Sequence, residues 1–231
     1  MVYFARKLIV MIRLYNEERG GLMSQEQNVI NYYVLCNRLK NMIRTGWKNW
    51  NVQRERLESV AEHIYGTQML AIAMKSEYQY DIDIMKVILM LAVHELGETV
   101  IGDLTQFEIS KAEKERKEHE AVHQILSNLL EHDLIEQLFL EFDSHATKEA
   151  VFAYQCDKLE CDLQCKLYDE EGCVDLKHQE GNISMEDVRV QELLKSGASW
   201  STMWLLFGQK SYPYDEHFRA VSNYAMNNKI K

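Results

Sequence analysis

The spacing of apolar positions predicts helices along most of the chain. Apolar residues recur at intervals of three and four, which is the period of an amphipathic helix. Three serines each precede an acidic residue by three positions, a pattern typical of a helix N-terminus; the pairs are Ser59 with Glu62, Ser110 with Glu113, and Ser184 with Asp187. The predicted helices span 25–44, 59–77, 82–99, 110–131, 133–142, 146–170, 185–196 and 213–228, and Gly172–Gly181 is predicted to be a polar, acidic loop. The sequence therefore predicts an all-α fold.

The segment 82–99 differs from the other predicted helices. From Ile82 to Val93 only two residues are charged, and a helix that is apolar on every side is expected in the centre of a bundle. The segment then runs into the adjacent pair His94-Glu95. Burying such a pair is costly unless something compensates, and a metal ion is a common compensation for neighbouring imidazole and carboxylate groups. A helix that emerges into solvent at His94 explains the segment equally well.

Composition and charge narrow the class of protein. The chain has 231 residues, 46% of them hydrophobic, with one proline and ten glycines, which are few turn-formers for a sandwich or barrel. The formal charge of −10 disfavours a nucleic-acid scaffold and an anionic-membrane binder. Five cysteines without a C-x-x-C pair favour a cytoplasmic protein. No run reaches the ~20 apolar residues needed to span a membrane. We expect a loose extension at 1–23 and a single domain at 24–231.

Three places carry candidate chemistry. The stretch from His94 to Glu98 differs from the zinc-protease pattern H-E-x-x-H, because Glu98 replaces the second histidine. His63 lies one turn into the helix that begins at Ser59. Asp157 lies on an apolar stripe of the helix 146–170, where an acid needs a partner such as a lysine or a metal ion. Taken singly, each signal is equally typical of an ordinary structural residue.

Taken in order, these stretches resemble the HD-domain metal phosphohydrolases, in particular the branch that contains the 5′-deoxynucleotidases and related HD-domain-containing proteins. The resemblance rests on Arg44–Trp47, on Glu58–His63 and on His94–Asp103, the last of which is similar to the family pattern H-D-x-x-E-x-x-x-G-D. It covers roughly residues 25–175. It implies an HD-domain helical bundle followed by a C-terminal helical extension.

The resemblance also implies a function and a site. The implied activity is a phosphomonoesterase acting on nucleoside 5′-monophosphates or deoxynucleotides with one divalent metal ion (Mn, Co, Mg, Fe or Zn), in a homodimer that binds neither nucleic acid nor membranes. The implied roles are metal ligation by His63, His94, Glu95 and Asp157, acid/base catalysis by Glu98, contact with the substrate sugar by Asp103, and lining of the nucleotide pocket by Arg44 and Trp47.

The chain departs from the family pattern inside this site. Glu95 stands where the family has aspartate, and its longer side chain must fold back to reach the ion, which predicts weaker metal retention. Trp50 stands where the family usually has arginine, and Arg54 or Arg56 are candidates to replace it. These departures favour an alternative, a degenerate HD domain that binds a nucleotide or a partner protein without turnover. In a third alternative, a purely structural helical protein, the ligand candidates would lie far apart.

Overall fold

Helices make up almost all of the regular structure. The computed structural model describes residues 24–105 and 108–231, and within them the only paired extended backbone is an isolated bridge between Ile43 and Ser59. The all-α prediction is confirmed, and the extension predicted at 1–23 lies outside the described residues. The longer elements are α2 (Gln25–Cys36), α4 (Val60–Tyr78), α5 (Ile84–Val93), α7 (Lys111–Leu126), α8 (His132–Ser144), α9 (Lys148–Glu170), α10 (Val188–Lys195), α11 (Trp200–Ser211) and α12 (Glu216–Asn227), and the short ones are η1 (Asn37–Asn41), α3 (Thr45–Asn49), α6 (Glu98–Ile101) and η2 (Ile183–Glu186).

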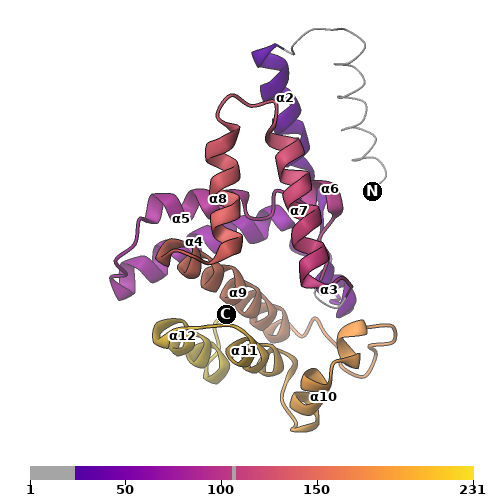
Figure 1. Cartoon of the computed structure of the whole chain (residues 1–231). Coiled ribbons are helices and arrows are strands. Elements are labelled where there is room, and N and C mark those ends of the chain that lie inside the picture. The colour runs from indigo at the N-terminus through magenta and orange to yellow at the C-terminus, as the bar shows by residue number, and fades with distance from the viewer. Residues whose placement is uncertain (1–23, 106–107) are drawn as a thin grey trace.

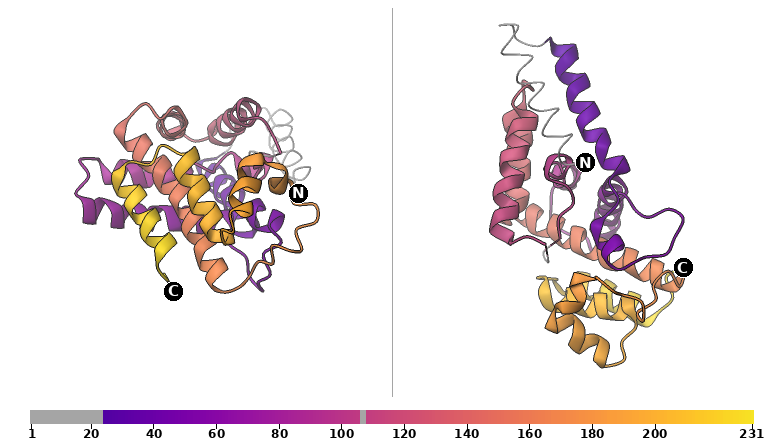
Figure 2. Two further views of the ribbon diagram at one scale, coloured as in Figure 1. Left: turned by 90° about the horizontal axis from the view of Figure 1, so that it is seen from below. Right: turned by 90° about the vertical axis from the view of Figure 1, so that its right-hand side faces the viewer.

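Helix α9 is the axis of the fold. It packs against α4, α5 and α8 on one side and against α11 and α12 on the other (Figure 1). The C-terminal helices α10 to α12 form a separate layer beneath it, and the views at right angles agree (Figure 2). The predicted C-terminal helical extension is therefore confirmed. Because α9 touches both layers, its side chains can meet residues from the two halves of the chain.

Three apolar clusters form the core. One joins α4, α5, α9 and α12, a second joins α3, α9, α10 and α11, and a third joins α2, α6, α7 and α8. Helix α9 contributes to the first two, and α8 contributes Phe142 to the first and Phe139 to the third. The single domain expected at 24–231 stays a prediction. Among those residues no helix combines the length and the apolar character needed to cross a membrane.

The predicted helix starts hold in two of three cases. Ser59 and Glu62 form a complete capping box at the start of α4, and the Ser110 hydroxyl accepts the Glu113 backbone N–H at the start of α7. The start predicted at Ser184 is wrong, because Ser184 lies in η2 and the cap of α10 is the Asp187 side chain. The acid that was expected to reach back to a serine thus caps the helix itself.

The predicted helix 82–99 is broken and only partly buried. Helix α5 ends at Val93, and a turn leads into the short α6. Met85 and Leu89 are 69% and 52% exposed. The prediction that the whole segment lies in the centre of the bundle is therefore wrong for the face that carries these two residues. At the turn, a Cβ on Gly97 would lie 3.0 Å from the Glu118 side chain, so the close approach of α7 depends on glycine here.

Other helix ends also differ from the prediction. The helix expected at 25–44 gives way to η1 after Cys36, and the helix expected at 110–131 ends at Leu126. Helix α11 was not predicted. Its N-cap Ser199 accepts the Thr202 backbone N–H, and a threonine at that position does not give the serine-to-acid signal used to locate helix starts.

Candidate metal centre and its cavity

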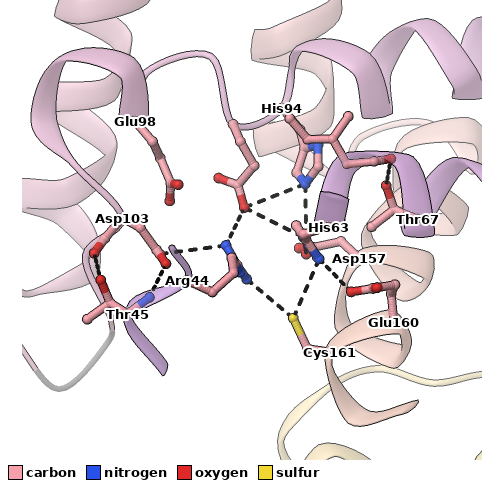
Figure 3. A network of polar contacts seen from close by, with 12 residues as sticks. Arg44, Thr45, His63, Thr67, His94, Glu98, Asp103, Asp157, Glu160 and Cys161 are labelled. Atoms are coloured by element: carbon pink, nitrogen blue, oxygen red, sulfur yellow. Dashed lines mark hydrogen bonds and ion pairs between the residues drawn. The ribbon is translucent and has the colours of Figure 1, made fainter. Parts of the chain in front are cut away.

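The four predicted metal ligands converge on one buried point. His63 comes from α4, His94 from the end of α5 and Asp157 from α9 (Figure 3). Glu95 lies in the turn that follows α5. Each offers a ligand atom, and these atoms all lie within 4.8 Å of one another. Ligands bound to one ion at ~2.0–2.2 Å stand roughly 3–4 Å apart, so small adjustments would complete a coordination shell. The purely structural reading, in which these residues lie far apart, is excluded.

The His94 ring carries the strongest indication of a cation. Its Nδ1 lies 2.8 Å from the Leu91 carbonyl oxygen, which only accepts, so Nδ1 holds the proton and Nε2 presents a lone pair. That lone pair faces Glu95 Oε1 at 3.6 Å and Asp157 Oδ1 at 3.9 Å. Nε2 is buried and has no hydrogen-bond partner among the described residues. A metal ion placed between these three atoms would use the lone pair that the protein leaves unpaired.

His63 is oriented by a carboxylate that the sequence did not single out. Its Nδ1 lies 2.6 Å from Glu160 Oε2, and its Nε2 lies 3.1 Å from Asp157 Oδ1. Metal-binding histidines commonly donate their second ring N–H to a carboxylate, which fixes the ring. Gly66 makes room for this contact, since a Cβ there would lie 2.3 Å from Glu160 Oε1. Its position three residues after Asp157 on α9 is the feature of the sequence that could have brought Glu160 to notice.

The charges of the cluster are mutually stabilised. Burial and the Arg44 charge lower the pKa of His63, but Cys161, Glu160 and the hydrogen bond to Asp157 raise it well above its ordinary value. Burial raises the pKa of Asp157, but Lys158 and His63 hold it well below its usual range. Because metal ligands must be deprotonated, a metal ion competes with the proton on His63, and metal affinity should fall at low pH.

Arg44 links the proposed metal ligands to the loop that follows α6. Its Nη1 lies 3.1 Å from Glu95 Oε1 and 3.6 Å from Asp103 Oδ1, and its Nη2 donates to Cys161 Sγ at 3.3 Å. Burial raises the pKa of Glu95, but the charges of Arg44 and Lys114 oppose this effect, and the pKa lies below its ordinary value. Glu95 therefore stays ionised, as a metal ligand requires.

Asp103 joins two segments at the rim of the site. Its Oδ2 accepts the Thr45 backbone N–H at 2.6 Å, and its own carbonyl oxygen accepts the Thr45 hydroxyl at 2.7 Å. These bonds hold the start of α3, and with it Arg44, against the loop after α6 (Figure 3). Contact of Asp103 with a substrate sugar stays a prediction.

Glu98 is a buried carboxyl next to the cluster. It is 0% exposed, its Oε1 lies 3.4 Å from Lys114 Nζ, and its Oε2 finds no hydrogen-bond partner in the described part of the chain. Carboxylate oxygens of Glu95, Glu98 and Glu118 lie within 4.8 Å of one another. Burial, with the nearby charges of Glu95 and Asp103, raises the pKa of Glu98 well above its ordinary value. A carboxyl held neutral in this way can donate a proton.

A cavity of about 380 Å³ opens onto the cluster. Its walls bring together acidic, basic and aromatic side chains: His94, Glu95 and Asp157; Arg44, Lys111, Lys114 and Lys158; and Trp47, Trp50, Trp204, Tyr154 and Tyr212. The Trp47 ring is only 2% exposed, and its indole N–H donates to Glu58 Oε2 at 2.7 Å, so it serves mainly as a wall. Neither Arg54 nor Arg56 lines the cavity; they pair with Glu171 and Glu62 instead. The lysines were not predicted from the sequence.

The fold and the cluster together define an all-helical protein with a buried His/carboxylate centre. Residues 36–195 match the HD domain family. The chain is 34% identical to the 5′-deoxynucleotidase HDDC2 of Dictyostelium discoideum, over 62% of this chain and 79% of that protein. It is 32% identical to the 5′-deoxynucleotidase HDDC2 of Homo sapiens, over 68% of this chain and 74% of that protein. Among solved structures, a Pyrococcus horikoshii OT3 protein matches with a TM-score of 0.60 at 21% identity, covering 86% of this chain and 98% of that one.

The chain belongs to the HD domain family. A predicted metal-dependent phosphohydrolase from Magnetospirillum magnetotacticum MS-1 has the same fold, with a TM-score of 0.58 at 21% identity over 89% of this chain and 97% of that one. The family and the enzyme class predicted from the sequence, a metal-dependent phosphohydrolase, are confirmed.

Proposed function

We propose that this protein hydrolyses deoxynucleoside 5′-monophosphates to the nucleoside and inorganic phosphate. The relatives named 5′-deoxynucleotidase support the substrate class. The observation that carries the proposal is the unpaired His94 Nε2, which faces Glu95 and Asp157, together with the buried carboxyl of Glu98 within 4.8 Å of the Glu95 carboxylate. This combination provides a place for a divalent ion and a proton donor a few ångströms away.

Residues in the cavity wall, with His63 and Glu98 behind it, divide three tasks: holding the ion, holding the phosphate and moving a proton. His63, His94, Glu95 and Asp157 would hold the ion, which when bound lowers the pKa of water and neutralises phosphate charge. The cations of Arg44, Lys114 and Lys158 line the same cavity and can pair with phosphate oxygens. Glu98 can give its proton to the sugar oxygen that leaves.

Phosphate release tests this function. We would assay a panel of deoxynucleoside and ribonucleoside 5′-monophosphates with Mn²⁺, Co²⁺ or Mg²⁺ added, and compare the wild type with Glu98→Ala. Glu120→Ala is the matched control, since Glu120 lies on the exposed side of α7 and pairs with Arg116. We expect Glu98→Ala to abolish turnover and the control to keep it. No release from any nucleotide, or release that Glu98→Ala leaves intact, would contradict the proposal.

The replacement of the family's aspartate by Glu95 favours a second function, binding of a nucleotide without turnover. In that case calorimetry would show tight binding of a nucleotide in the presence of a chelator, and no phosphate release with any metal. Binding that depends on the metal, followed by hydrolysis, would exclude this alternative.

We also propose that the protein is a cytoplasmic homodimer. Large apolar side chains are exposed on the packed helices α4 and α5: Tyr65, Met69, Ile72, Met85 and Leu89. Their spacing of three or four residues places them in an apolar stripe on each helix, and exposed apolar surface of this kind commonly marks an interface between proteins. Light scattering coupled to gel filtration would show a dimer that Met69→Glu converts to a monomer. A monomeric wild type at micromolar concentration would contradict this proposal.

A further inference from the structure

The cavity has an aromatic end that is completed from outside the family match. The match stops at residue 195, whereas Trp204 on α11 and Tyr212 just after α11 line the cavity together with the metal cluster. Helix α11 packs along α9, and α9 itself lines the cavity with Asp157, Lys158 and Cys161. The C-terminal layer thus contributes directly to the site.

Trp204 is the tryptophan whose ring remains open to the cavity. Trp47 and Trp50 also line it but are each 2% exposed, so their ring faces are covered by protein. Trp204 is half-buried. Its ring packs on Trp47, at a centroid distance of 5.3 Å and a tilt of 31°, and only the edge of the Trp200 ring meets it, at 6.2 Å, a contact that a phenylalanine ring can also make. The ring packed on Trp47 offers a preorganised flat surface.

The indole N–H of Trp204 is an unused donor. Nε1 is buried from solvent and has no hydrogen-bond partner within the described residues. A buried donor without an acceptor is costly, and a ligand that supplies an acceptor removes that cost. The Arg and Lys side chains and the proposed metal ligands suit the phosphate of a substrate. The aromatic side chains of the cavity are then left for the remainder of the molecule. A flat group with acceptor atoms at its edge fits both features of Trp204.

We propose that Trp204 binds the nucleobase of the substrate. Its ring stacks on the base and turns as the base enters, so that the Nε1–H, which is buried in the ligand-free protein, donates to a carbonyl oxygen or ring nitrogen at the edge of the base. This assignment rests on the proposed function, because it takes the phosphate to lie at the metal end. It makes Trp204 a specificity-determining residue of the C-terminal layer, which distinguishes a nucleotide from a phosphate ester that lacks a base.

The test compares substrates that differ only in the base. Deoxynucleoside 5′-monophosphates and 2-deoxyribose 5-phosphate share the sugar and the phosphate. We expect Trp204→Ala to lower the preference for the nucleotide, as the ratio of kcat/KM values, about tenfold through lost stacking. Trp204→Phe keeps a ring but loses the donor, and should lower the preference about threefold. A change in kcat/KM that is equal for both substrates would overturn the assignment.

Trp200→Phe is the matched control. Trp200 lies on the same helix, is 1% exposed and also has an indole N–H without a hydrogen-bond partner in the described chain, but it does not line the cavity. We expect this variant to keep the wild-type preference. If Trp200→Phe lowers the preference as much as Trp204→Phe does, the effect is general packing and the assignment is wrong. If Trp204→Ala fails to fold, the comparison of Trp204→Phe with Trp200→Phe still tests the assignment.

Binding without turnover separates this inference from the proposed function. Isothermal calorimetry with Glu98→Gln and Mn²⁺ measures the affinity for a deoxynucleoside 5′-monophosphate and for 2-deoxyribose 5-phosphate. If no phosphate is released by the wild type but Trp204→Phe still weakens only the nucleotide, the proposed function fails and the base site stands. If the wild type binds or hydrolyses both compounds equally well, the base site is wrong and the phosphatase stands.

Discussion

Two groups of residues lie in and behind the cavity wall: the proposed ligands with Glu98, called the metal end here, and the tryptophan cluster with its neighbours, called the aromatic end. Burial affects their energies in opposite ways. At the metal end, Glu98 is 0% exposed with one oxygen unpaired, and His94 presents an unpaired ring nitrogen. At the aromatic end, Trp200 is 1% exposed and packs against Trp47, Trp50 and Trp204. Removing a carboxylate from water is unfavourable, whereas removing an indole is favourable. Burial therefore lowers the stability of the fold at the metal end, where the proposed reaction takes place, and raises it at the aromatic end.

This contrast predicts that variants at the two ends separate activity from stability. The largest effect is expected for Glu98→Gln, which keeps the size of the side chain but removes the proton that the carboxyl can donate. We expect kcat to fall about 10²–10⁴-fold, the usual contribution of a general acid or base. The free energy of unfolding in denaturant should stay the same or increase, because a buried ionisable group is replaced by a neutral one. A variant that unfolds more easily would show that the Lys114 contact outweighs the cost of burial.

The opposite result is expected for Trp200→Ala at the aromatic end. Loss of a fully buried tryptophan leaves a cavity and should lower the free energy of unfolding by about 3–5 kcal/mol. Below the shifted melting temperature, the affinity for Mn²⁺ measured by calorimetry should be unchanged, since Trp200 touches none of the proposed ligands. Loss of metal binding in the folded variant would mean that the two ends are coupled through α9.

The two ends also differ in how much of each could be predicted from the sequence. The metal end is built from local signals: the capping box at Ser59 fixes the position of His63 on its helix, and the His94 stretch is a short pattern. The turn after Val93 was not foreseen, because it depends on Gly97 packing against Glu118 from another helix.

The aromatic end depends on contacts between distant segments. Trp204 and Trp47 are far apart in sequence and meet only because α11 lies along α9 beside α3, and no local pattern encodes that meeting. The same holds for Glu160, which can be recognised as the partner of His63 only after α4 and α9 are packed. Residue type and spacing therefore identified the metal ligands, while the tertiary fold was needed to identify their supports.

Glu58 is a test of the comparison, because it is a carboxyl at the aromatic end. It accepts the Trp47 indole N–H, and burial, with the charge of Glu160, raises its pKa to about 8. The folded protein thus holds a proton that the unfolded chain releases above its ordinary pKa of 4.5. In the presence of a chelator that removes any metal ion, the free energy of unfolding should therefore fall as the pH rises from about 5 to 8.

Glu58→Gln keeps an acceptor for Trp47 and removes the titration, so it should flatten this pH dependence. Urea unfolding at several pH values measures it. Glu98, and Glu118 with a pKa raised by burial to about 7, add changes of the same sign that remain in the variant, so its pH dependence becomes less steep but does not vanish. If the slope with pH is the same in both proteins, Glu58 is ionised in the folded state and the aromatic end tolerates charge.

The smallest effect concerns the metal end, where Glu95→Asp restores the residue expected in the family. Glutamate must fold back to place its oxygen beside His63 Nε2, now 3.7 Å away, and fixing the longer chain costs up to about 1–2 kcal/mol of side-chain entropy. We therefore expect Glu95→Asp to bind Mn²⁺ about tenfold more tightly by calorimetry, and Glu95→Ala to lose binding. Arg44 provides the counter-argument, since its 3.1 Å contact with Glu95 Oε1 already fixes the longer side chain. If that contact has removed the entropy cost, aspartate will bind the ion no better, and Arg44→Met will weaken the wild type but not Glu95→Asp.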